Sequence, residues 1–134
     1  KGTLEDVIKG REIFIGVSKG NVLTEAMARS MAPRPVIFAL ANPIPEIMPD
    51  AARRAGAYII ATGRSDFPNQ INNLLAFPGI FRGALDNKIR QFKDRMFIQA
   101  AKNIATYVKR PTPARIIPDI LDKRVVREVA RAMK

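Results

Sequence analysis

The sequence predicts an α/β protein in which three short parallel strands alternate with helices and are followed by long helices after residue 87. Apolar runs of strand length lie at residues 13–17, 36–40 and 58–61, and each is followed by small polar residues and then by a helix signal. A strand that is apolar at consecutive positions is typical of a parallel sheet covered by helices on both faces. We therefore expect these runs to be central strands that are covered on both sides.

Helix signals accompany the strands in the expected places. Residues 4–8 form a first helix candidate, and Thr24 can cap a second helix after the first strand. Pro49 suits a first helical position, and the helix that follows it ends at Gly56. The resulting order of strand, helix, strand, helix and strand is half of a doubly wound, Rossmann-like nucleotide-binding fold.

The last third of the sequence is helical by its periodicity. Apolar residues recur there at steps of three and four, which predicts one buried stripe along a helix. The stripe consists of Ile89, Phe92, Met96, Ala100, Ile104 and Val108. Pro111 ends this pattern, and Asp122 can cap a final helix, with Leu121 and Val126 placed as a hydrophobic staple.

No Gly-x-Gly-x-x-Gly sequence is present, and the chain opens in a helix candidate without a strand that could carry one. A doubly wound domain without this phosphate-binding loop looks truncated. We expect residues 1–87 to be the second half of this Rossmann-like nucleotide-binding domain. Residues 88–134 are expected to be C-terminal helices that pack on that domain, and on a missing N-terminal part of the protein or a partner subunit.

The composition excludes several classes of chemistry. The 134 residues include no Cys and no His, so the chain offers no thiol nucleophile, no Ser-His-Asp triad and no His-ligated metal site. No apolar run reaches the roughly 18 residues that a membrane helix requires. Residues 1–6 also lack the apolar stretch of a signal peptide. We expect a cytoplasmic protein that has no membrane partner.

The net charge of +11 is placed unevenly along the chain. Residues 1–70 carry a net charge of +2, whereas residues 71–134 carry +9. A basic nucleic-acid-binding module is one explanation of this asymmetry. The alternative is a solvated helical face or a surface that meets an acidic partner chain. We favour the alternative, and expect no nucleic-acid partner, because no nucleic-acid-binding motif accompanies the charge.

Small polar turns follow all three predicted strands, at residues 16–21, 41–43 and 62–66. Ligands of open α/β sheets bind beyond the carboxyl ends of the strands. Ordinary turn chemistry explains any one of these turns, but three turns at the same sheet edge favour a ligand site. Asn42 is held before Pro43, and its amide can either bind a carboxamide or carboxylate ligand or cap its own turn.

Residues 69–73 are the most unusual segment, because four of the five side chains are primary amides. One of them can cap a helix, but adjacent Asn residues gain little inside a helix. Neutral amides can bind a hydroxy-acid without shifting the pKa values of neighbouring acids and bases. We therefore favour a ligand-binding role for this segment over a purely structural one.

Four blocks of the sequence resemble malic enzymes, most closely the short bacterial and archaeal forms. They lie in the family's order and spacing at residues 14–18, 38–46, 61–73 and 75–86, so the resemblance covers nearly the whole chain. The resemblance implies an enzyme that oxidatively decarboxylates malate to pyruvate and CO2, with NAD or NADP and with Mg²⁺ or Mn²⁺. We also expect the complete enzyme to be a homo-oligomer.

The resemblance implies that residues 1–87 are the second half of an NAD(P)-binding Rossmann-like domain, and it implies roles for residues in the first two turns. Gly16, Val17 and Ser18 are expected to lie along the cofactor. Asn42 is expected near the nicotinamide end of the cofactor.

The resemblance places malate on Asn73, with Asn72 beside it. The family's Gly-rich phosphate loop, its catalytic Tyr and Lys, and its acidic metal ligands all lie upstream of the matched part. We therefore expect no catalytic residue and no metal ligand in this chain. The chain alone is expected to have no malate-decarboxylating activity.

The sequence departs from the family pattern at two places. The first turn continues with Lys19, Gly20 and Asn21, where relatives usually have Gly or Ala followed by Pro-Gly. A cationic Lys19 could meet a cofactor phosphate there. Met48 precedes Pro49 where many relatives have an Asp cap, and the loss of such a cap costs about 1 kcal/mol of helix stability.

Overall fold

The computed structural model describes residues 2–134, which fold as two compact units. The first unit ends at Ile71, and the second runs Asn72–Lys134. Among the described residues no helix is long and apolar enough to cross a membrane.

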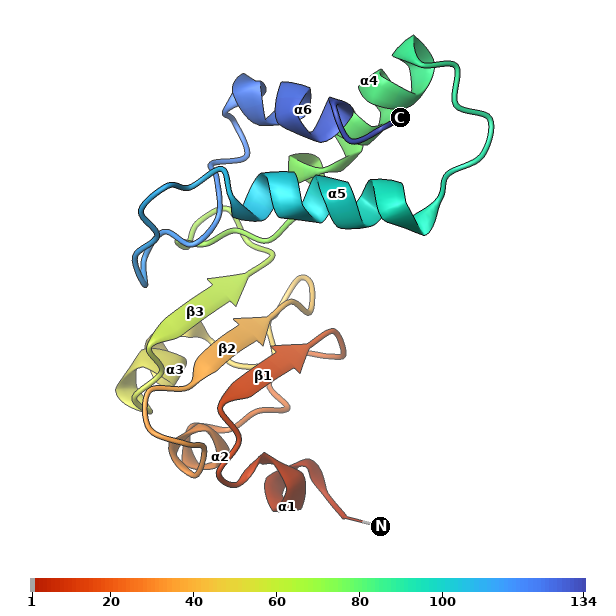
Figure 1. Ribbon diagram of the computed structural model, residues 1–134. Helices are drawn as coiled ribbons and strands as arrows, with labels where there is room; N and C mark the ends of the chain where they lie inside the picture. The colour runs from red at the N-terminus through yellow and green to blue at the C-terminus, as the bar shows by residue number, and fades with distance from the viewer. Residues whose placement is uncertain (1) are drawn as a thin grey trace. The chain divides into compact units, whose positions relative to one another are not determined.

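The first unit contains a sheet of three parallel strands in the order β1-β2-β3 (Figure 1). The strands are β1 (Ile13–Gly16), β2 (Val36–Ala39) and β3 (Ile59–Thr62). Both strand pairs are parallel and in register. This result confirms the predicted α/β fold with three parallel strands, whose observed ends differ from the expected ones by a single residue.

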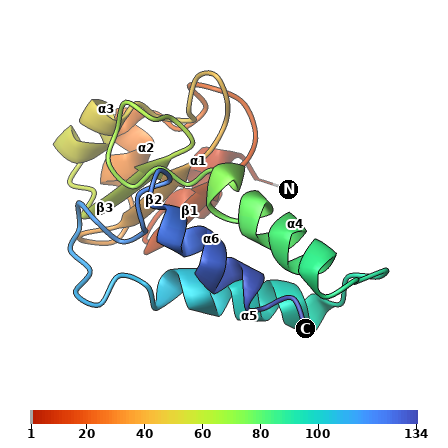
Figure 2. The same ribbon diagram turned by 90° about the horizontal axis from the view of Figure 1, so that it is seen from above.

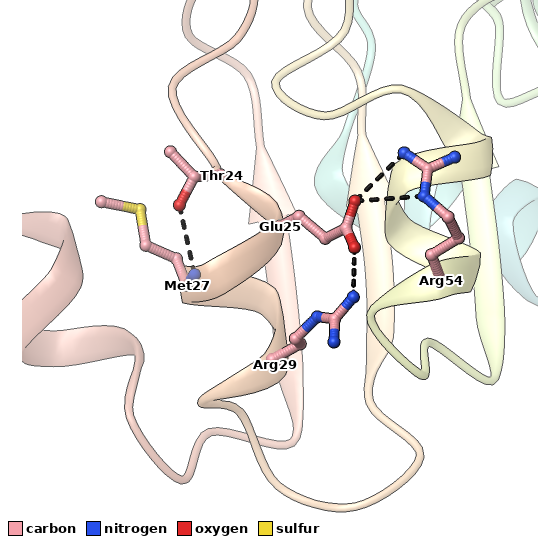
Figure 3. A network of polar contacts seen from close by, with 5 residues as sticks. All are labelled: Thr24, Glu25, Met27, Arg29 and Arg54. Atoms are coloured by element: carbon pink, nitrogen blue, oxygen red, sulfur yellow. Dashed lines mark hydrogen bonds and ion pairs between the residues drawn. The ribbon is translucent and has the colours of Figure 1, made fainter.

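Three short helices accompany the strands: α1 (Leu4–Ile8), α2 (Glu25–Arg29) and α3 (Pro49–Arg54). The Thr24 hydroxyl oxygen accepts a hydrogen bond of 3.2 Å from the backbone N–H of Met27, as the capping prediction requires (Figure 3). Pro49 occupies the first position of α3, and Met48 before it makes no side-chain capping bond. The helix signals read from the sequence are therefore confirmed in position and in type.

An ion-pair network joins α2 to α3 (Figure 3). The Glu25 carboxylate accepts hydrogen bonds from Arg29 on its own helix and from Arg54 at the end of α3. Arg54 Nη2 lies 3.0 Å from Glu25 Oε2. Because both arginines are exposed and Glu25 is only partly buried, the network contributes little to stability. It shows, however, that α2 and α3 are neighbours on one side of the unit.

The core of the first unit lies between the helices and one face of the sheet. It contains the buried side chains of Ile8, Phe14, Leu23, Ala28, Met31, Ile37, Ala39, Ile47 and Ala52. On the opposite face of β1, Ile13 is 57% exposed and Ile15 is 62% exposed. The expectation that helices cover both sides is therefore wrong for β1 within this chain. An apolar run cannot reveal whether its cover comes from the same segment or from another part of a larger protein.

The second unit is helical, with a 3₁₀ turn η1 (Asn73–Leu75) before α4 (Phe77–Asp86), α5 (Asp94–Ala105) and α6 (Lys123–Ala130). Helix α6 lies between α4 and α5 (Figure 2). The core of this second unit consists of Leu75, Ile80, Met96, Ala100, Val125, Val129, Ala132 and Met133. We expected a domain division after residue 87, which would place α4 with the first unit. Helix α4 instead belongs to the second unit, where it packs on α6.

The predicted apolar stripe is confirmed in its middle, and Ile89 at its start packs against the same core. Met96 and Ala100 are buried, and Ile104 packs against them. Helix α5 begins at Asp94, so Phe92 lies in the preceding loop, where it is 40% exposed and contacts the Phe97 ring at a centroid distance of 5.6 Å. The expected stripe was therefore too long, because the periodic spacing of apolar residues continues into the loop before the helix.

Asp122 caps α6 as expected, because its carboxylate accepts a hydrogen bond of 3.0 Å from the Arg124 backbone N–H. The expected staple beside this cap is wrong, since Leu121 is 81% exposed. The backbone N–H of Leu121 donates a hydrogen bond of 2.8 Å to Asp119 Oδ1. This turn directs the chain so that the Leu121 side chain faces solvent.

Helix α4 was not anticipated, because Pro78, Gly79 and Gly83 are poor helix formers. The two glycines have a packing role instead. A Cβ on Gly79 would lie 2.5 Å from the Cβ of Val129, and a Cβ on Gly83 would lie 2.8 Å from the Cβ of Met133. These glycines therefore let the backbones of α4 and α6 approach closely.

Candidate functional site

The candidate site lies at the carboxyl edge of the sheet in the first unit, where three strands end side by side (Figure 1). The chain leaves β1 after Gly16, β2 after Ala39 and β3 after Thr62. Because all three strands are parallel, the turns that follow them share one edge, as the sequence predicted.

A buried carboxylate ties the first two turns together. Glu46 is fully buried, with 0% of its surface exposed. Its Oε1 accepts hydrogen bonds from the backbone N–H of Ser18, at 2.7 Å, and from the Ser18 hydroxyl, at 3.1 Å. Its Oε2 accepts a bond of 3.0 Å from the backbone N–H of Ala41. The side chain therefore bridges the turn after β1 and the turn after β2.

The environment of Glu46 keeps it ionised. Burial by itself raises the pKa of this carboxyl group, but the hydrogen bonds from Ser18, from Ala41 and from its own backbone N–H outweigh burial. The net result is a pKa below the ordinary value, because each of these bonds favours the charged form. A buried negative charge is thus compensated by N–H and O–H donors from two turns.

Backbone hydrogen bonds join the same two segments. Asn21 donates from its backbone N–H to the Pro45 carbonyl, and Leu23 donates to the Glu46 carbonyl, both at 3.0 Å. A Cβ on Gly16 would lie 2.5 Å from the Glu46 carboxyl carbon, so only glycine fits at the end of β1. The close pairing of the two turns therefore depends on a glycine at this position.

The four predicted cofactor residues lie in these two turns. Gly16 is buried at the end of β1, Val17 is 78% exposed, and Ser18 is exposed with its N–H and hydroxyl both directed to Glu46. Asn42 is exposed, and its peptide bond to Pro43 is cis. The structure thus brings the four residues to one edge of the sheet and gives Ser18 a structural partner as well.

Sequence reasoning gave no role to Glu46, although a signal was present. It is an acidic residue within the otherwise apolar segment Ile44–Ile47, and such a position calls for a buried partner. Its partners are the Ser18 hydroxyl and the backbone N–H groups of Ser18 and Ala41, and no residue pattern reveals the backbone groups. The role of Glu46 therefore became visible only in the folded chain.

The third turn carries an ion pair. Arg64 Nη2 lies 2.7 Å from Asp66 Oδ2, and the Arg64 guanidinium lies 5.4 Å from the centroid of the Phe67 ring. The hydrogen bond to Arg64 lowers the pKa of Asp66. Arg64 also donates from Nη1 to the Pro43 carbonyl oxygen at 3.5 Å, which links the third turn to the second.

Three of the four amide side chains in residues 69–73 have structural partners. The Asn69 amide nitrogen donates to the Ile60 carbonyl at 2.9 Å, and Gln70 donates to the Gly63 carbonyl at 3.3 Å. The Asn72 amide oxygen accepts a bond of 3.0 Å from the Leu74 backbone N–H and caps η1. Structural roles thus explain more of this segment than one helix cap.

Asn73 differs from the other three amides. It is exposed as the first residue of η1, and within residues 2–134 no hydrogen bond to its side chain is observed. Asn72 and Asn73 belong to the second unit, whereas the cofactor residues belong to the first. Of the two residues predicted to bind malate, Asn73 is the one whose amide is not used by the fold.

The titratable groups of the described residues do not form a metal site. Within residues 2–134, no group of three or more His, Cys, Asp or Glu is placed so that it could hold a metal ion. The divalent cation that the family resemblance implies therefore has no set of ligands among these residues.

Part of the positive charge of the second unit is balanced locally. Arg82 pairs with Asp86 along α4, and Arg131 pairs with Glu128 on α6 at 2.7 Å. Such pairing on helix surfaces fits a solvated face.

Comparison with known proteins agrees with this architecture. The family model "Malic enzyme, NAD binding domain" matches residues 1–134. The chain is 53% identical over 134 residues to the bifunctional malic/malolactic enzyme of Bacillus subtilis. This match covers 98% of the chain and 33% of that protein. It is 48% identical to the NAD-dependent malic enzyme of Geobacillus stearothermophilus, over 99% of the chain and 28% of that protein.

Solved structures show the same likeness. The NAD-dependent malic enzyme from Thermotoga maritima is 50% identical, with a TM-score of 0.94 over 99% of this chain and 35% of that one. The malic enzyme from Pyrococcus horikoshii is 46% identical, with a TM-score of 0.92 over 98% of this chain and 31% of that one. These matches give no support to the nucleic-acid-binding alternative.

The chain spans about a third or less of the length of these relatives, and it matches their NAD-binding part. The strand order, the three turns at one sheet edge and the family match over residues 1–134 agree with one another. The chain therefore belongs to the malic enzyme family, as part of its NAD-binding domain.

Proposed function

We propose that the complete protein oxidatively decarboxylates malate to pyruvate and CO2 while it reduces NAD or NADP, and that this chain supplies cofactor and malate contacts. The observation that carries the proposal is the paired turn edge after β1 and β2, in a chain that matches the malic enzyme NAD-binding domain throughout. Relatives that use NAD and relatives that use NADP both match, so we propose a nicotinamide dinucleotide without assigning one of the two.

The turn residues fit a dinucleotide by their chemistry. Gly16 lets the turn after β1 lie directly against Glu46. The exposed apolar side chain of Val17 in this turn can pack on a flat ring or a ribose. The exposed Asn42 amide offers two donors and one acceptor, which suits the carboxamide of nicotinamide. When bound, the nicotinamide ring supplies the hydride acceptor. The role of these residues is to bind and orient the nicotinamide ring.

We assign the malate contact to Asn73. Its exposed amide can pair with a carboxylate or hydroxyl of the substrate. Asn72 acts at the same place, because its cap bond to Leu74 fixes the 3₁₀ turn on which Asn73 lies. We thus propose that the Asn72 amide holds the turn and that the Asn73 amide contacts the substrate.

The remaining groups of the reaction are assigned to other parts of the complete protein. We propose that the proton-transferring residues and the ligands of Mg²⁺ or Mn²⁺ lie outside this chain, because the family motifs for them have no match here. Residues 88–134 are proposed to pack on the NAD-binding domain and on another part of the enzyme or a partner subunit. We further propose that the complete enzyme is a cytoplasmic homo-oligomer.

The test is an assay of the complete protein that carries this chain, with malate, Mn²⁺ and either NAD or NADP. The proposal predicts that reduced dinucleotide, pyruvate and CO2 form in equal amounts, whereas the isolated chain forms none of them. Lactate should be measured in parallel, since the name of the Bacillus subtilis relative includes malolactic activity. A complete, folded protein that forms no reduced dinucleotide from malate would contradict the proposal.

A further inference from the structure

We propose that Glu46 is a positioning residue for the dinucleotide, which acts by fixing the distance between the turn after β1 and the turn after β2. This inference rests on the proposed function, because it assumes that the two turns bind the cofactor. The residue is fully buried, and its two carboxylate oxygens are shared between the turns. Oε1 holds Ser18, and Oε2 holds Ala41, which precedes Asn42.

The geometry requires two acceptor atoms on one side chain. One oxygen receives two donors from Ser18, and the other receives the backbone N–H of Ala41. An amide side chain offers one acceptor oxygen and, in place of the second oxygen, an NH2 group that only donates. If a Gln carbonyl oxygen faced Ser18, its NH2 group would face the Ala41 N–H, so two donors would meet without an acceptor. Glutamine at this position can therefore hold one turn but not both.

The Glu46 carboxylate is closely packed between the two turns. The end of β1 lies against the carboxylate at Gly16, where a Cβ would be 2.5 Å from the Glu46 carboxyl carbon. Within the described residues, the hydrogen-bond donors to the carboxylate are main-chain N–H groups and the Ser18 hydroxyl. A change at Glu46 therefore alters the spacing of the turns, and with it the relative positions of Val17 and Asn42.

The consequence is specific to the dinucleotide. The turns that Glu46 joins carry the proposed cofactor residues, whereas Asn73 lies in the second unit. Loss of the carboxylate should thus raise the KM for NAD(P) strongly and the KM for malate weakly. A residue with a merely structural role would lower stability without separating the two KM values.

The experiment compares Glu46→Gln with the parent in the complete enzyme. Expected is a rise of about 10-fold in the KM for the dinucleotide, with the KM for malate changed by less than about 3-fold. The dissociation constant of the dinucleotide, measured without malate, should rise by a similar factor. A folded Glu46→Gln enzyme with an unchanged KM and dissociation constant for the dinucleotide would overturn the proposal.

Glu25→Gln is the matched control, since it also removes a carboxylate from the first unit. Glu25 joins α2 to α3 through Arg29 and Arg54, on the exposed surface of these helices (Figure 3). Its replacement is expected to leave both KM values unchanged. An equal rise in the dinucleotide KM in Glu25→Gln would show a general effect of lost carboxylates and would overturn the specific role of Glu46.

Ser18→Ala is the second variant, and it can still contradict the proposal if Glu46→Gln does not fold. It removes only the hydroxyl bond to Glu46 and retains the backbone bond, so the dinucleotide KM is expected to rise by about 2- to 5-fold. In a double-mutant cycle, the rise in the dinucleotide KM of the double variant should be smaller than the product of the rises caused by Ser18→Ala and Glu46→Gln alone. An unchanged dinucleotide KM in Ser18→Ala, or fully multiplicative effects, would overturn the proposal.

Failure of this inference and failure of the proposed function give different results. If the parent enzyme forms no reduced dinucleotide from malate, the proposed function is wrong. If the parent is active and the variants bind the dinucleotide normally, only the role of Glu46 is wrong.

Discussion

Gly79 of α4 lies so close to Val129 of α6 that a Cβ on Gly79 would stand 2.5 Å from the Cβ of Val129. The Val126 carbonyl oxygen would be 2.7 Å from the same Cβ, so the obstacle includes backbone that cannot rotate away. Gly79→Ala is therefore expected to lower the free energy of unfolding by about 1–3 kcal/mol, even though Ala favours a helix intrinsically. Urea unfolding of the parent and the variant measures this difference.

Gly63→Ala is the control for this prediction. The nearest atoms to a Cβ on Gly63 would be carbonyl oxygens of Ile71 and Leu40 at 3.7 and 3.8 Å, which is ordinary contact. Its stability should stay within about 0.5 kcal/mol of the parent. Equal stability of the two variants would mean that α4 and α6 do not pack as closely as described.

Asn69 tests whether the amide segment has a structural part. The residue is 7% exposed, its amide donates to the Ile60 carbonyl, and its φ of 57° lies in the left-handed region. Asn69→Ala should lower the free energy of unfolding by about 1–3 kcal/mol, because it removes the hydrogen bond and strains the backbone. Thermal and urea unfolding check this outcome.

Asn69→Gly separates the two causes. Glycine removes the same hydrogen bond but adopts positive φ without strain. Asn69→Gly should therefore be less destabilising than Asn69→Ala. If the two variants are equally stable, backbone strain does not contribute at this position.

The pH dependence of stability should reveal Glu46. Its pKa is lowered in the folded chain from an ordinary value of 4.5, so ionised Glu46 stabilises the fold above that value. This contribution is lost as the pH falls through the lower pKa of the folded state. The parent should therefore exceed Glu46→Gln in stability by about 1–3 kcal/mol at neutral pH, and the gap should close in acid.

Urea unfolding at a series of pH values between neutral and strongly acidic measures that gap. Glu25→Gln serves as the exposed comparison, because its lowered pKa arises from surface pairing with Arg29 and Arg54. A gap for Glu46→Gln that stays constant with pH would show that folding does not lower the pKa of Glu46, and would contradict this prediction.

The strands and several caps were predictable because they depend on local chemistry. Apolar runs marked β1, β2 and β3, and the side chains of Thr24 and Asp122 marked helix starts. Helix α4 was not predictable from local preference, since its glycines are required by contact with Val129 and Met133, far away in sequence.

The candidate site was predictable in its location but not in its support. Parallel strands necessarily bring their following turns to one edge, so the position of Ser18 and Asn42 followed from the strand pattern. The bridge through Glu46 depends on backbone N–H groups, which every residue type offers alike. Among the amides of residues 69–73, the sequence could not separate those used by the fold from Asn73.

Asn73→Ala in the complete enzyme tests the central claim most directly, namely that this chain supplies a malate contact to an NAD(P)-dependent malate oxidoreductase. A lost hydrogen bond to a charged group should lower kcat/KM for malate by about 10- to 150-fold. The KM for the dinucleotide and the Tm should hardly change, because the side chain is exposed and makes no observed bond within residues 2–134. An unchanged kcat/KM for malate together with a lowered Tm would contradict the account.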